Sequence, residues 1–445
     1  MSRSLPITPT RRACEAASMM GAAITRDLAT HEFAWLPSDA RVLDARLTLV
    51  TGPSGAGKTR FLEHARSVFR SRGAPVIDPD RLRPADKPAV DLVGRDASRA
   101  MRALASVGLA ELRCFVRRPS ELSEGQRVRL RLAMALDRAP KSKLAAIVID
   151  EFGGSLDAVT ARNLALLLRR LSARRPNLRF VIASNREFVA PALAPNLHVA
   201  IDLAGGAREA VGEPLRIGEL FAIGTGTRGD LGALLPFHYR AGAPATVERV
   251  LRAVDAETGT LAGVLAVSRP TLCGAWRARA WPGVFDGPDR VASAARVNRE
   301  LRTISRVIVD PRFRGLGVAT SLVRAALRSP ITRCTEAVAS MGALCPFFRV
   351  AGMAEFRVPE STRDARLRAA LADAGVETWR LAQPDLALAR AVRALGEEAI
   401  GRELRTWAKA SGSTARLAGA PIGEVFARAA VSVASRPVAY AHGSV

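Results

Sequence analysis

Residues 52–59 constrain this chain more than any other segment. They read Gly-Pro-Ser-Gly-Ala-Gly-Lys-Thr, which fits the pattern G-x-x-x-x-G-K-[ST], between the apolar run 47–50 and the helical segment 60–69. Glycines allow backbone N–H groups to turn around a phosphate at a helix N-terminus. Lys58 is expected to reach the β- and γ-phosphates, and the Thr59 hydroxyl is expected to bind Mg²⁺. We call residues 52–59 the phosphate loop, and it predicts a nucleoside triphosphate site.

Two carboxylates follow a second apolar run. Residues 145–149 are Ala-Ala-Ile-Val-Ile, and Asp150 and Glu151 come directly after them. Open α/β sheets bind ligands at the carboxyl ends of their strands. We therefore expect Asp150 to bind Mg²⁺ and Glu151 to polarise the attacking water. Runs of β character also alternate with amphipathic segments such as 126–138 and 161–171, which indicates a parallel sheet covered by helices.

A third motif lies between these two. Leu122-Ser123-Glu124-Gly125-Gln126 precedes a helical segment, and Ser155-Leu156-Asp157 follows Glu151. With these residues, positions 30–205 resemble the ATP-binding cassette (ABC) family, whose signature LSGGQ is nearly reproduced. The resemblance implies that Ser123 and Gly125 contact the γ-phosphate held by a partner subunit, and hence a head-to-tail homodimer with ATP between the copies. The expected ATP-binding residues are Gly52, Pro53, Ser54, Gly55, Ala56, Gly57, Lys58, Thr59, Ser123, Gly125, Gln126 and Asp157, with Thr59 and Asp150 as metal ligands.

Some positions depart from the family pattern or allow two interpretations. Asn185 stands where the family has its switch histidine, so we expect slow hydrolysis. Phe33 or Trp35 would suit stacking on the adenine, and packing beneath the sheet suits either of them equally well.

A second glycine turn follows the strand-like run 304–309. Residues 312–317 read Arg-Phe-Arg-Gly-Leu-Gly and precede the helical segment 320–328, so Gly315 and Gly317 place backbone N–H groups at a helix start. The segment resembles the acetyl-CoA loop of the GNAT acyltransferases, and residues 346–353 resemble the closing segment of that family. The acetyl-CoA-binding residues that this implies are Val307, Val309, Arg312, Phe313, Arg314, Gly315, Leu316, Gly317, Val318 and Ala319.

The residues that would catalyse acyl transfer are harder to assign. Such enzymes often protonate the leaving thiolate with a tyrosine, and Phe348 stands at that position. Glu336 is a candidate base, and Cys345 is a candidate acid or transient nucleophile. Glu300 is a weaker candidate base, and His238 or Tyr239 would suit the lining of the acceptor cleft. Each of these side chains also suits a purely structural role.

The length of 445 residues favours about two to three domains. Glycine and proline residues, together with the loss of a periodic pattern of apolar residues, predict a domain boundary near 208–214. We predict an α/β fold with an N-terminal extension (1–30), an ABC-type P-loop ATPase domain (31–207), a linker (208–214), a GNAT-like α+β domain (215–360) with a hairpin at 247–254 and 260–267, and a mostly helical C-terminal extension (361–445). This order resembles ABC-type ATPases fused to a predicted GNAT-type acetyltransferase domain.

The composition of the chain indicates which kinds of partner it can bind. The chain has 66 basic and 42 acidic residues, giving a net charge of +24, which favours polyanions such as DNA or RNA. All but five of the basic residues are arginines, so a GC-rich codon bias explains the charge equally well. The five cysteines contain no C-x-x-C pair, and no apolar run reaches the length of a membrane span. We therefore expect a soluble cytoplasmic protein with no membrane partner.

These observations lead to one main functional hypothesis. We expect an ATP- and Mg²⁺-dependent enzyme that transfers an acyl group from acetyl-CoA, or another acyl-CoA, to a macromolecular acceptor such as DNA or RNA, with protein acetylation equally open. The alternative is a nucleotide-gated binding protein whose transferase fold has lost catalysis. A transport ATPase is a third hypothesis, which the transferase-like continuation of the chain disfavours.

Overall fold

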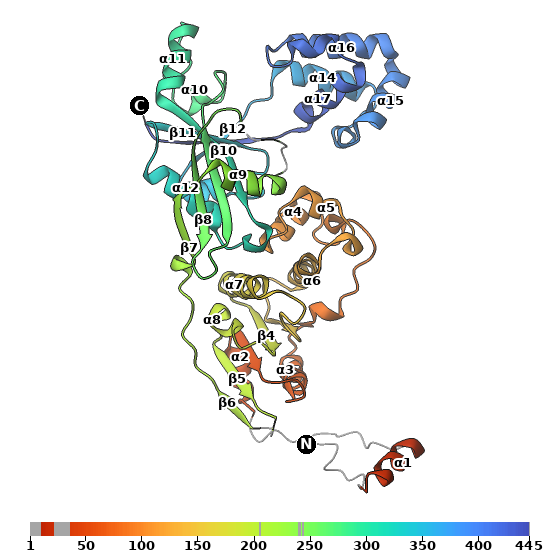
Figure 1. The fold of residues 1–445 in the computed structure, drawn as a ribbon. Coiled ribbons are helices and arrows are strands. Elements are labelled where there is room, and N and C mark those ends of the chain that lie inside the picture. Colours follow the sequence, from red (N-terminus) through yellow and green to blue (C-terminus); the bar gives the residue numbers. More distant parts are fainter. Residues whose placement is uncertain (1–9, 22–35, 204–205, 239–241, 243, 445) are drawn as a thin grey trace. The chain divides into compact units, whose positions relative to one another are not determined.

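The computed structural model describes the chain except for residues 1–9, 22–35, 204–205, 239–241, 243 and 445 (Figure 1). The chain divides into two compact units. Unit 1 comprises Met1–Leu220 and Pro311–Leu316, and unit 2 comprises Phe221–Asp310 and Gly317–Val445. Three candidates, Phe33, Trp35 and Tyr239, lie outside the described residues, as does most of the expected N-terminal extension.

The core of unit 1 is a six-stranded sheet with the order β2-β3-β4-β1-β5-β6. The first five strands in this order are parallel, and β6 runs antiparallel to β5. The strands are β1 (Leu47–Thr51), β2 (Val76–Ile77), β3 (Ala145–Ile149), β4 (Leu178–Ser184), β5 (Leu197–Ile201) and β6 (Ala207–Glu209). Because β1, β3 and β4 are neighbours, the segments that come after them leave the sheet at the same edge.

Helices cover this sheet, as the sequence predicts. The helices that follow residue 35 in unit 1 are α2 (Asp39–Asp44), α3 (Lys58–Ser71), α4 (Ala97–Ser106), α5 (Leu112–Val116), α6 (Glu124–Arg138), α7 (Ala158–Arg174) and α8 (Val189–Leu193). Helix α1 (Arg11–Met19) has no buried residue. One face of α3 is fully buried against the sheet, with Phe61, Leu62 and Phe69 in a core that includes Val50 and Val148. This packing fixes the start of α3, and with it the end of the phosphate loop.

Unit 2 contains a seven-stranded sheet with the order β12-β13-β11-β10-β9-β8-β7. Its strands are β7 (Phe221–Thr225), β8 (Val247–Asp255), β9 (Leu261–Ser268), β10 (Leu301–Val309), β11 (Cys334–Ala339), β12 (Ala354–Arg357) and β13 (Val438–His442). The predicted hairpin is confirmed as β8 and β9. Only β10 and β11 pair in parallel among the described strands of this sheet, and the other neighbours are antiparallel.

Strand β10 is irregular at its centre. Its pairing with β9 changes register between Ile304 and Arg306, which makes Ser305 a bulge. Its pairing with β11 runs only from Leu301 to Ile304, opposite 334–337, whereas its pairing with β9 continues to Val309. The second half of β10 therefore diverges from β11.

The segment after residue 360 differs from the expected C-terminal extension. Its helices α14 (Thr362–Asp373), α15 (Pro384–Leu395), α16 (Glu397–Lys409) and α17 (Ile422–Ala434) form a separate apolar core (Figure 1). The chain then returns as β13, which pairs with both β11 and β12. The helices are thus inserted between two neighbouring strands of one sheet. Sequence reasoning missed this because five residues of moderate hydropathy carry no strand signal beside long helices.

The other helices of unit 2 are short. They are α9 (Arg228–Leu234), α10 (Arg277–Ala280), α11 (Arg290–Glu300), α12 (Val318–Arg328) and α13 (Phe347–Ala351). The boundary between the units also differs from the expected linker, because Ala207–Glu209 pairs as β6 and unit 2 begins only at Phe221. Across the described residues, none of the helices is both long enough and apolar enough to cross a membrane.

Candidate functional site

The phosphate loop leaves the buried strand β1 through glycines in conformations that other residues rarely adopt. Gly52, Gly55 and Gly57 have φ of 154°, 85° and 98°. A Cβ on Gly52 would lie 2.3 Å from the carbonyl oxygen of Ile201, so only glycine fits there. Around Gly55 a Cβ would meet nothing within 4 Å, so this side of the loop is open. The loop thus combines a fixed base with an accessible rim.

Lys58 and Thr59 begin helix α3. Lys58 is 9 % exposed, and its ammonium donates to the carbonyl oxygens of Gly52 and Pro53 at 2.8 and 2.7 Å. The Thr59 hydroxyl donates to Oδ2 of Asp150 at 3.1 Å. The structure therefore brings together the phosphate loop and the end of β3, which are 91 residues apart in the sequence.

These residues fit a magnesium nucleotide. A hydroxyl and a carboxylate are the hard oxygen donors that Mg²⁺ prefers, and the ammonium and the glycine-rich turn suit phosphates. In the described part of the chain, no group of three or more histidine, cysteine, aspartate or glutamate side chains is arranged to hold a metal ion. The phosphates of the nucleotide would therefore have to complete the metal's coordination.

Glu151 lies beside Asp150, the predicted metal ligand, in a strained backbone conformation. Its φ is 47°, in the left-handed region, and its backbone N–H donates to Oδ1 of Asp150 at 2.9 Å. A non-glycine residue in this region costs about 1–2 kcal/mol and is typical of functional sites. Its side chain is exposed, as activation of a water molecule requires.

The signature and the Asp157 segment both form helix N-caps. Ser123 caps α6 through a capping box, in which its Oγ accepts from the N–H of Gln126 and its own N–H donates to Oε1 of Gln126. Asp157 caps α7 and accepts from the N–H of Thr160 at 3.0 Å. Burial acts to raise the pKa of Asp157, but the hydrogen bonds from Thr160 outweigh it and the net pKa is lowered. Gly125 lies against Leu156 and Thr160, so the two helix starts are neighbours.

Two residues at and after the end of β4 support this arrangement and were missed from the sequence. The Ser184 hydroxyl donates to the carbonyl oxygen of Phe152 at 2.9 Å. The guanidinium of Arg186 donates to the carbonyl oxygens of Gly154 and Leu156 at 3.1 and 2.9 Å. They connect the end of β4 to the loop between Glu151 and Asp157. Asn185 lies between them and is exposed.

A further carboxylate reaches Asp150 from the segment after β2. Oδ2 of Asp80 accepts a hydrogen bond from the N–H of Asp150 at 3.3 Å. Burial raises the pKa of Asp80, and the neighbouring carboxylate of Asp78 adds to this rise. No sequence pattern selects Asp80, because β2 has only two residues and the contact depends on its pairing with β3.

The second glycine turn is divided between the two units. Gly315 and Gly317 have φ of 81° and 94°, and Gly317 is the N-cap of α12. Pro311–Leu316 belongs to unit 1, although β10 and α12 on either side belong to unit 2. Within unit 1, the carbonyl oxygen of Arg312 accepts from Arg129 and Asn163, both at 3.2 Å.

Other contacts of this segment in unit 1 involve charged groups. Arg314 forms an ion pair with Glu111. Arg129 on α6 is 4 % exposed, and it also donates to the carbonyl oxygen of Val107 at 2.8 Å. Burial lowers the pKa of Arg129 to about 10, and the nearby Arg314 adds to the effect. Of the expected acetyl-CoA residues, Val307 and Val309 lie on β10, and Val318 and Ala319 begin α12.

The candidate base Glu336 is committed to a buried ion pair. Its two carboxylate oxygens accept from Nε and Nη2 of Arg277 at 2.8 and 2.7 Å, and the two side chains are only 4 % and 3 % exposed. Arg277 also donates to the carbonyl oxygens of Thr271 and Leu272. The expectation that Glu336 is a general base is therefore not supported by its surroundings, because the carboxylate is inaccessible and already neutralised.

Phe348 packs against the buried Tyr440 of β13. Their ring centroids are 5.0 Å apart, and Tyr440 is fully buried. Burial raises the pKa of Tyr440 to about 12. Cys345 lies just before α13, the helix that carries Phe348. It is partly exposed and forms no disulfide. Its position in the loop after β11 is compatible with the predicted role as an acid or transient nucleophile, which stays a prediction.

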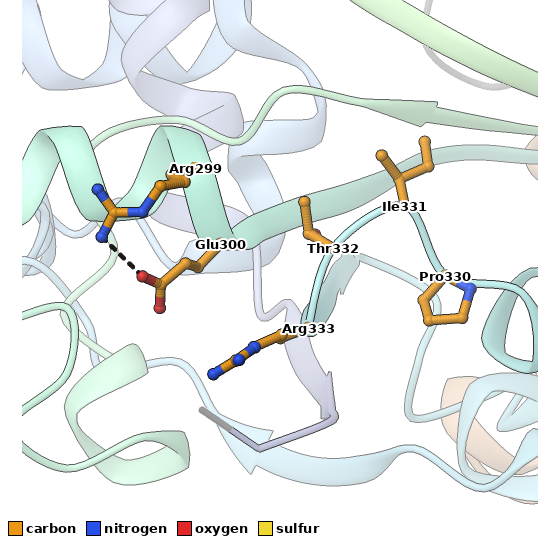
Figure 2. A pocket seen from close by; sticks show the side chains of 6 residues that line it. All are labelled: Arg299, Glu300, Pro330, Ile331, Thr332 and Arg333. Carbon is orange, nitrogen blue, oxygen red and sulfur yellow. Dashed lines mark hydrogen bonds and ion pairs between the residues drawn. The ribbon is translucent and has the colours of Figure 1, made fainter.

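Glu300 lines an open pocket of about 590 Å³ in unit 2 (Figure 2). The pocket is lined by Arg299, Glu300, Pro330, Ile331, Thr332 and Arg333. Figure 2 shows the ion pair between Arg299 and Glu300, which measures 2.8 Å. Glu300 precedes β10, whereas the glycine turn follows the other end of that nine-residue strand, about 30 Å away at ~3.3 Å per residue. Glu300 is therefore far from the predicted acyl-CoA loop.

Comparisons with known proteins identify one part of the chain. It is 32% identical over 169 residues to the aliphatic sulfonates import ATP-binding protein SsuB 2 of Rhodococcus jostii (strain RHA1), a match that covers 34% of this chain and 67% of that protein. The corresponding protein of Nocardia farcinica (strain IFM 10152) is 34% identical over 153 residues, which are 31% of this chain and 61% of that protein. The chain thus spans about three fifths to two thirds of the length of these relatives.

Solved structures are similar over a comparable share. The dimeric structure of MJ0796, a bacterial ABC transporter cassette, has 20% identity and a TM-score of 0.30, with coverage of 38% of this chain and 86% of that one. CbiO1 from Clostridium perfringens, part of the ABC transporter complex cbiONQ, has 16% identity and a TM-score of 0.29 over 37% and 75%. No family model matches the chain. From the sequence relatives, together with the residues assembled around the phosphate loop, we conclude that this chain belongs to the ATP-binding cassette family of ATP-binding proteins.

Proposed function

We propose that the chain is an ATP-dependent acyltransferase, in which unit 1 binds and hydrolyses Mg-ATP and unit 2 transfers an acyl group from acyl-CoA to a macromolecular acceptor. The observation that supports acyl transfer in unit 2 is the divergence of β10 from β11 directly before the second glycine turn. A strand that leaves its parallel neighbour offers its backbone to an extended amide-bearing ligand, and pantetheine is such a ligand. The R-x-x-G-x-G segment at the end of this strand suits the adjoining pyrophosphate.

The proposed transfer forms one bond and breaks one bond at the thioester carbon. A nucleophilic acceptor atom forms a bond to the thioester carbonyl carbon, the carbon–sulfur bond breaks, and CoA leaves as a thiolate that takes up the acceptor's proton. Backbone N–H groups near the Ser305 bulge are suited to polarise the carbonyl. Because Glu336 is neutralised and buried, the proton has to leave through another group or through water.

For unit 1 we propose an ATP-dependent homodimer, with Ser123 and Gly125 of one copy completing the nucleotide site of the other. Glu151 positions the attacking water, Lys58 stabilises phosphate charge, and Thr59 and Asp150 hold Mg²⁺. The two helices that Ser123 and Asp157 cap also carry Arg129 and Asn163, which donate to the carbonyl oxygen of Arg312. This supports a coupling between nucleotide state and the acyl-CoA loop.

The net charge of +24 supports a polyanionic acceptor, DNA or RNA. A second candidate function has its own support. The ion pair of Glu336 with Arg277 and the burial of Phe348 beside Tyr440 favour a nucleotide-gated binding protein without transferase activity. The predicted base is closed into an ion pair, and position 348 holds a phenylalanine instead of an accessible phenol.

The test is transfer of label from radiolabelled acetyl-CoA into separated DNA, RNA and protein, with and without Mg-ATP. We expect label in the nucleic-acid fraction that requires ATP and that is lost in Lys58→Ala and Gly315→Glu. Label only in the protein fraction would show that the acceptor is a protein and not a nucleic acid. ATP and CoA binding without any label would favour the binding protein, and absence of CoA binding would overturn the transferase proposal.

A further inference from the structure

We infer that the pocket of Figure 2 binds a free α-amino acid with an aliphatic side chain, whose ammonium contacts Glu300 and whose carboxylate contacts Arg333. The site lies within unit 2, whereas the phosphate loop belongs to unit 1. The inference goes beyond the proposed function, because neither ATP nor acyl-CoA takes part in it.

The pocket lies where two neighbouring strands begin. Leu301 of β10 is opposite Cys334 of β11 in their parallel pairing. Glu300 and Arg333 directly precede these two residues, and both line the pocket (Figure 2). The Thr332 hydroxyl donates to the carbonyl oxygen of Cys334 at 3.0 Å, which fixes this end of the loop before β11. The sheet therefore brings one carboxylate and one guanidinium, 33 residues apart in the sequence, to the same pocket.

Glu300 supplies a negative charge that the protein balances only in part. Its Oε1 accepts from Arg299 at 2.8 Å, but the side chain of Arg299 is 68% exposed, so solvent weakens this ion pair. Its Oε2 is covered and accepts no hydrogen bond from the described residues. Glu300 also ends helix α11, where the helix dipole favours a cation. An ammonium group, with three N–H donors, would supply the missing hydrogen bond and balance this charge.

Arg333 supplies the positive charge. It is exposed, and within the described ranges its side chain forms no ion pair. Burial raises the pKa of the Cys334 thiol to about 11, the carboxylate of Glu300 adds to the rise, and Arg333 opposes it. The two opposite charges thus act on the same thiol without pairing with each other. An α-amino acid carries an ammonium and a carboxylate on one carbon atom, and a guanidinium binds a carboxylate through two hydrogen bonds.

The rest of the lining favours an aliphatic ligand side chain. Pro330 and Ile331 line the pocket, and Ile331 is 38% exposed. A ligand side chain that covers this apolar surface removes it from water, which favours binding. The pocket volume of about 590 Å³ lies within the range of small-molecule sites, about 300–1,000 Å³. A bound amino acid would also connect the starts of β10 and β11.

The experiment measures binding of L-leucine, L-isoleucine and L-valine to the full chain by calorimetry, without nucleotide or acyl-CoA. For the one that binds most tightly, two analogues separate the contacts, namely the amine that lacks the carboxylate and the acid that lacks the ammonium. We expect each analogue to bind at least about 10-fold more weakly than the amino acid, because each loses one charge-assisted contact.

Two variants assign the contacts to their residues. Arg333→Gln and Glu300→Gln should each weaken amino-acid binding by about 10-fold or more. In Arg333→Gln the amino acid and the amine should bind equally well, because the contact to the carboxylate is gone. Arg328→Gln is the matched control, since Arg328 is an exposed arginine near the same loop that does not line the pocket. It should match wild type.

A second readout is hydrogen exchange of residues 331–337, which the amino acid should slow in wild type and not in Arg333→Gln. Arg333 is exposed, so this variant keeps the test valid even if Glu300→Gln does not fold. The inference would be overturned if none of the three amino acids binds at up to about 10 mM, where a millimolar ligand would be detected. Equal wild-type affinity for the amino acid and the amine, or unchanged affinity in Arg333→Gln, would also overturn it.

Discussion

The two glycine turns of this molecule have the same local design and different surroundings. Gly57 and Gly317 each cap a helix that comes after a strand, with φ of 98° and 94°. Around the first, the sheet gathers Lys58, Thr59 and Asp150 into one oxygen- and ammonium-lined site. In the unit that holds Gly317, the predicted base Glu336 lies opposite Thr303, near the other end of β10, and is closed into an ion pair. A glycine turn therefore indicates where a phosphate can bind, and only the residues delivered by neighbouring strands indicate which chemistry the site can support.

The largest effect is expected in the first site. Glu151→Gln should reduce ATP hydrolysis by at least about 100-fold, because an amide cannot accept a proton from the attacking water. Lys58→Ala should reduce it as strongly by weakening nucleotide binding. Measuring both phosphate release and ATP binding distinguishes the two variants, because only Lys58→Ala should weaken ATP binding. Normal hydrolysis in Glu151→Gln would remove this residue from the mechanism.

The second effect concerns the ion pair of unit 2. Removing one member of a buried pair typically costs about 3–5 kcal/mol, so Glu336→Ala should lower the free energy of unfolding by that order. The double variant Arg277→Met/Glu336→Leu should recover much of the loss, because it leaves no buried charge unpaired. Denaturant unfolding measures both. A stable Glu336→Ala protein with lost acyl transfer would instead restore this residue as a catalytic base.

The two units differ in how much of each could be predicted from the sequence. The phosphate loop, Asp150 and the cap residues Ser123 and Asp157 were found because each belongs to a short pattern that specifies its own local structure. Asp80 and Arg186 were missed because their contacts depend on which strands are neighbours. The return of β13 was missed for the same reason, since 80 residues separate it from β12 in the chain.

A matched pair of substitutions compares the two turns directly. Gly57→Ala and Gly317→Ala each force a side chain into the left-handed region at a helix N-cap, at a cost of about 1–2 kcal/mol. We expect Gly57→Ala to weaken ATP binding by about 10-fold and to leave CoA binding unchanged. Gly317→Ala should do the reverse. Calorimetry with both ligands tests this, and the lack of any effect of Gly317→Ala on CoA would contradict a pyrophosphate site at the second turn.

The smallest effect concerns the link between nucleotide state and the second turn. Asn163 on α7 is almost fully buried and donates to the carbonyl oxygen of Arg312 at 3.2 Å. Asn163→Ala removes this hydrogen bond, worth about 1 kcal/mol, so ATP should stimulate CoA binding or acyl transfer several-fold less. ATP affinity should stay unchanged, because Asn163 lies within α7, beyond the Asp157 cap. The measurement is CoA binding with and without Mg-ATP in wild type and variant. Equal stimulation in both would show that Asn163 carries no coupling, and the hydrogen bond from Arg129 to the same carbonyl oxygen would then be the next contact to remove.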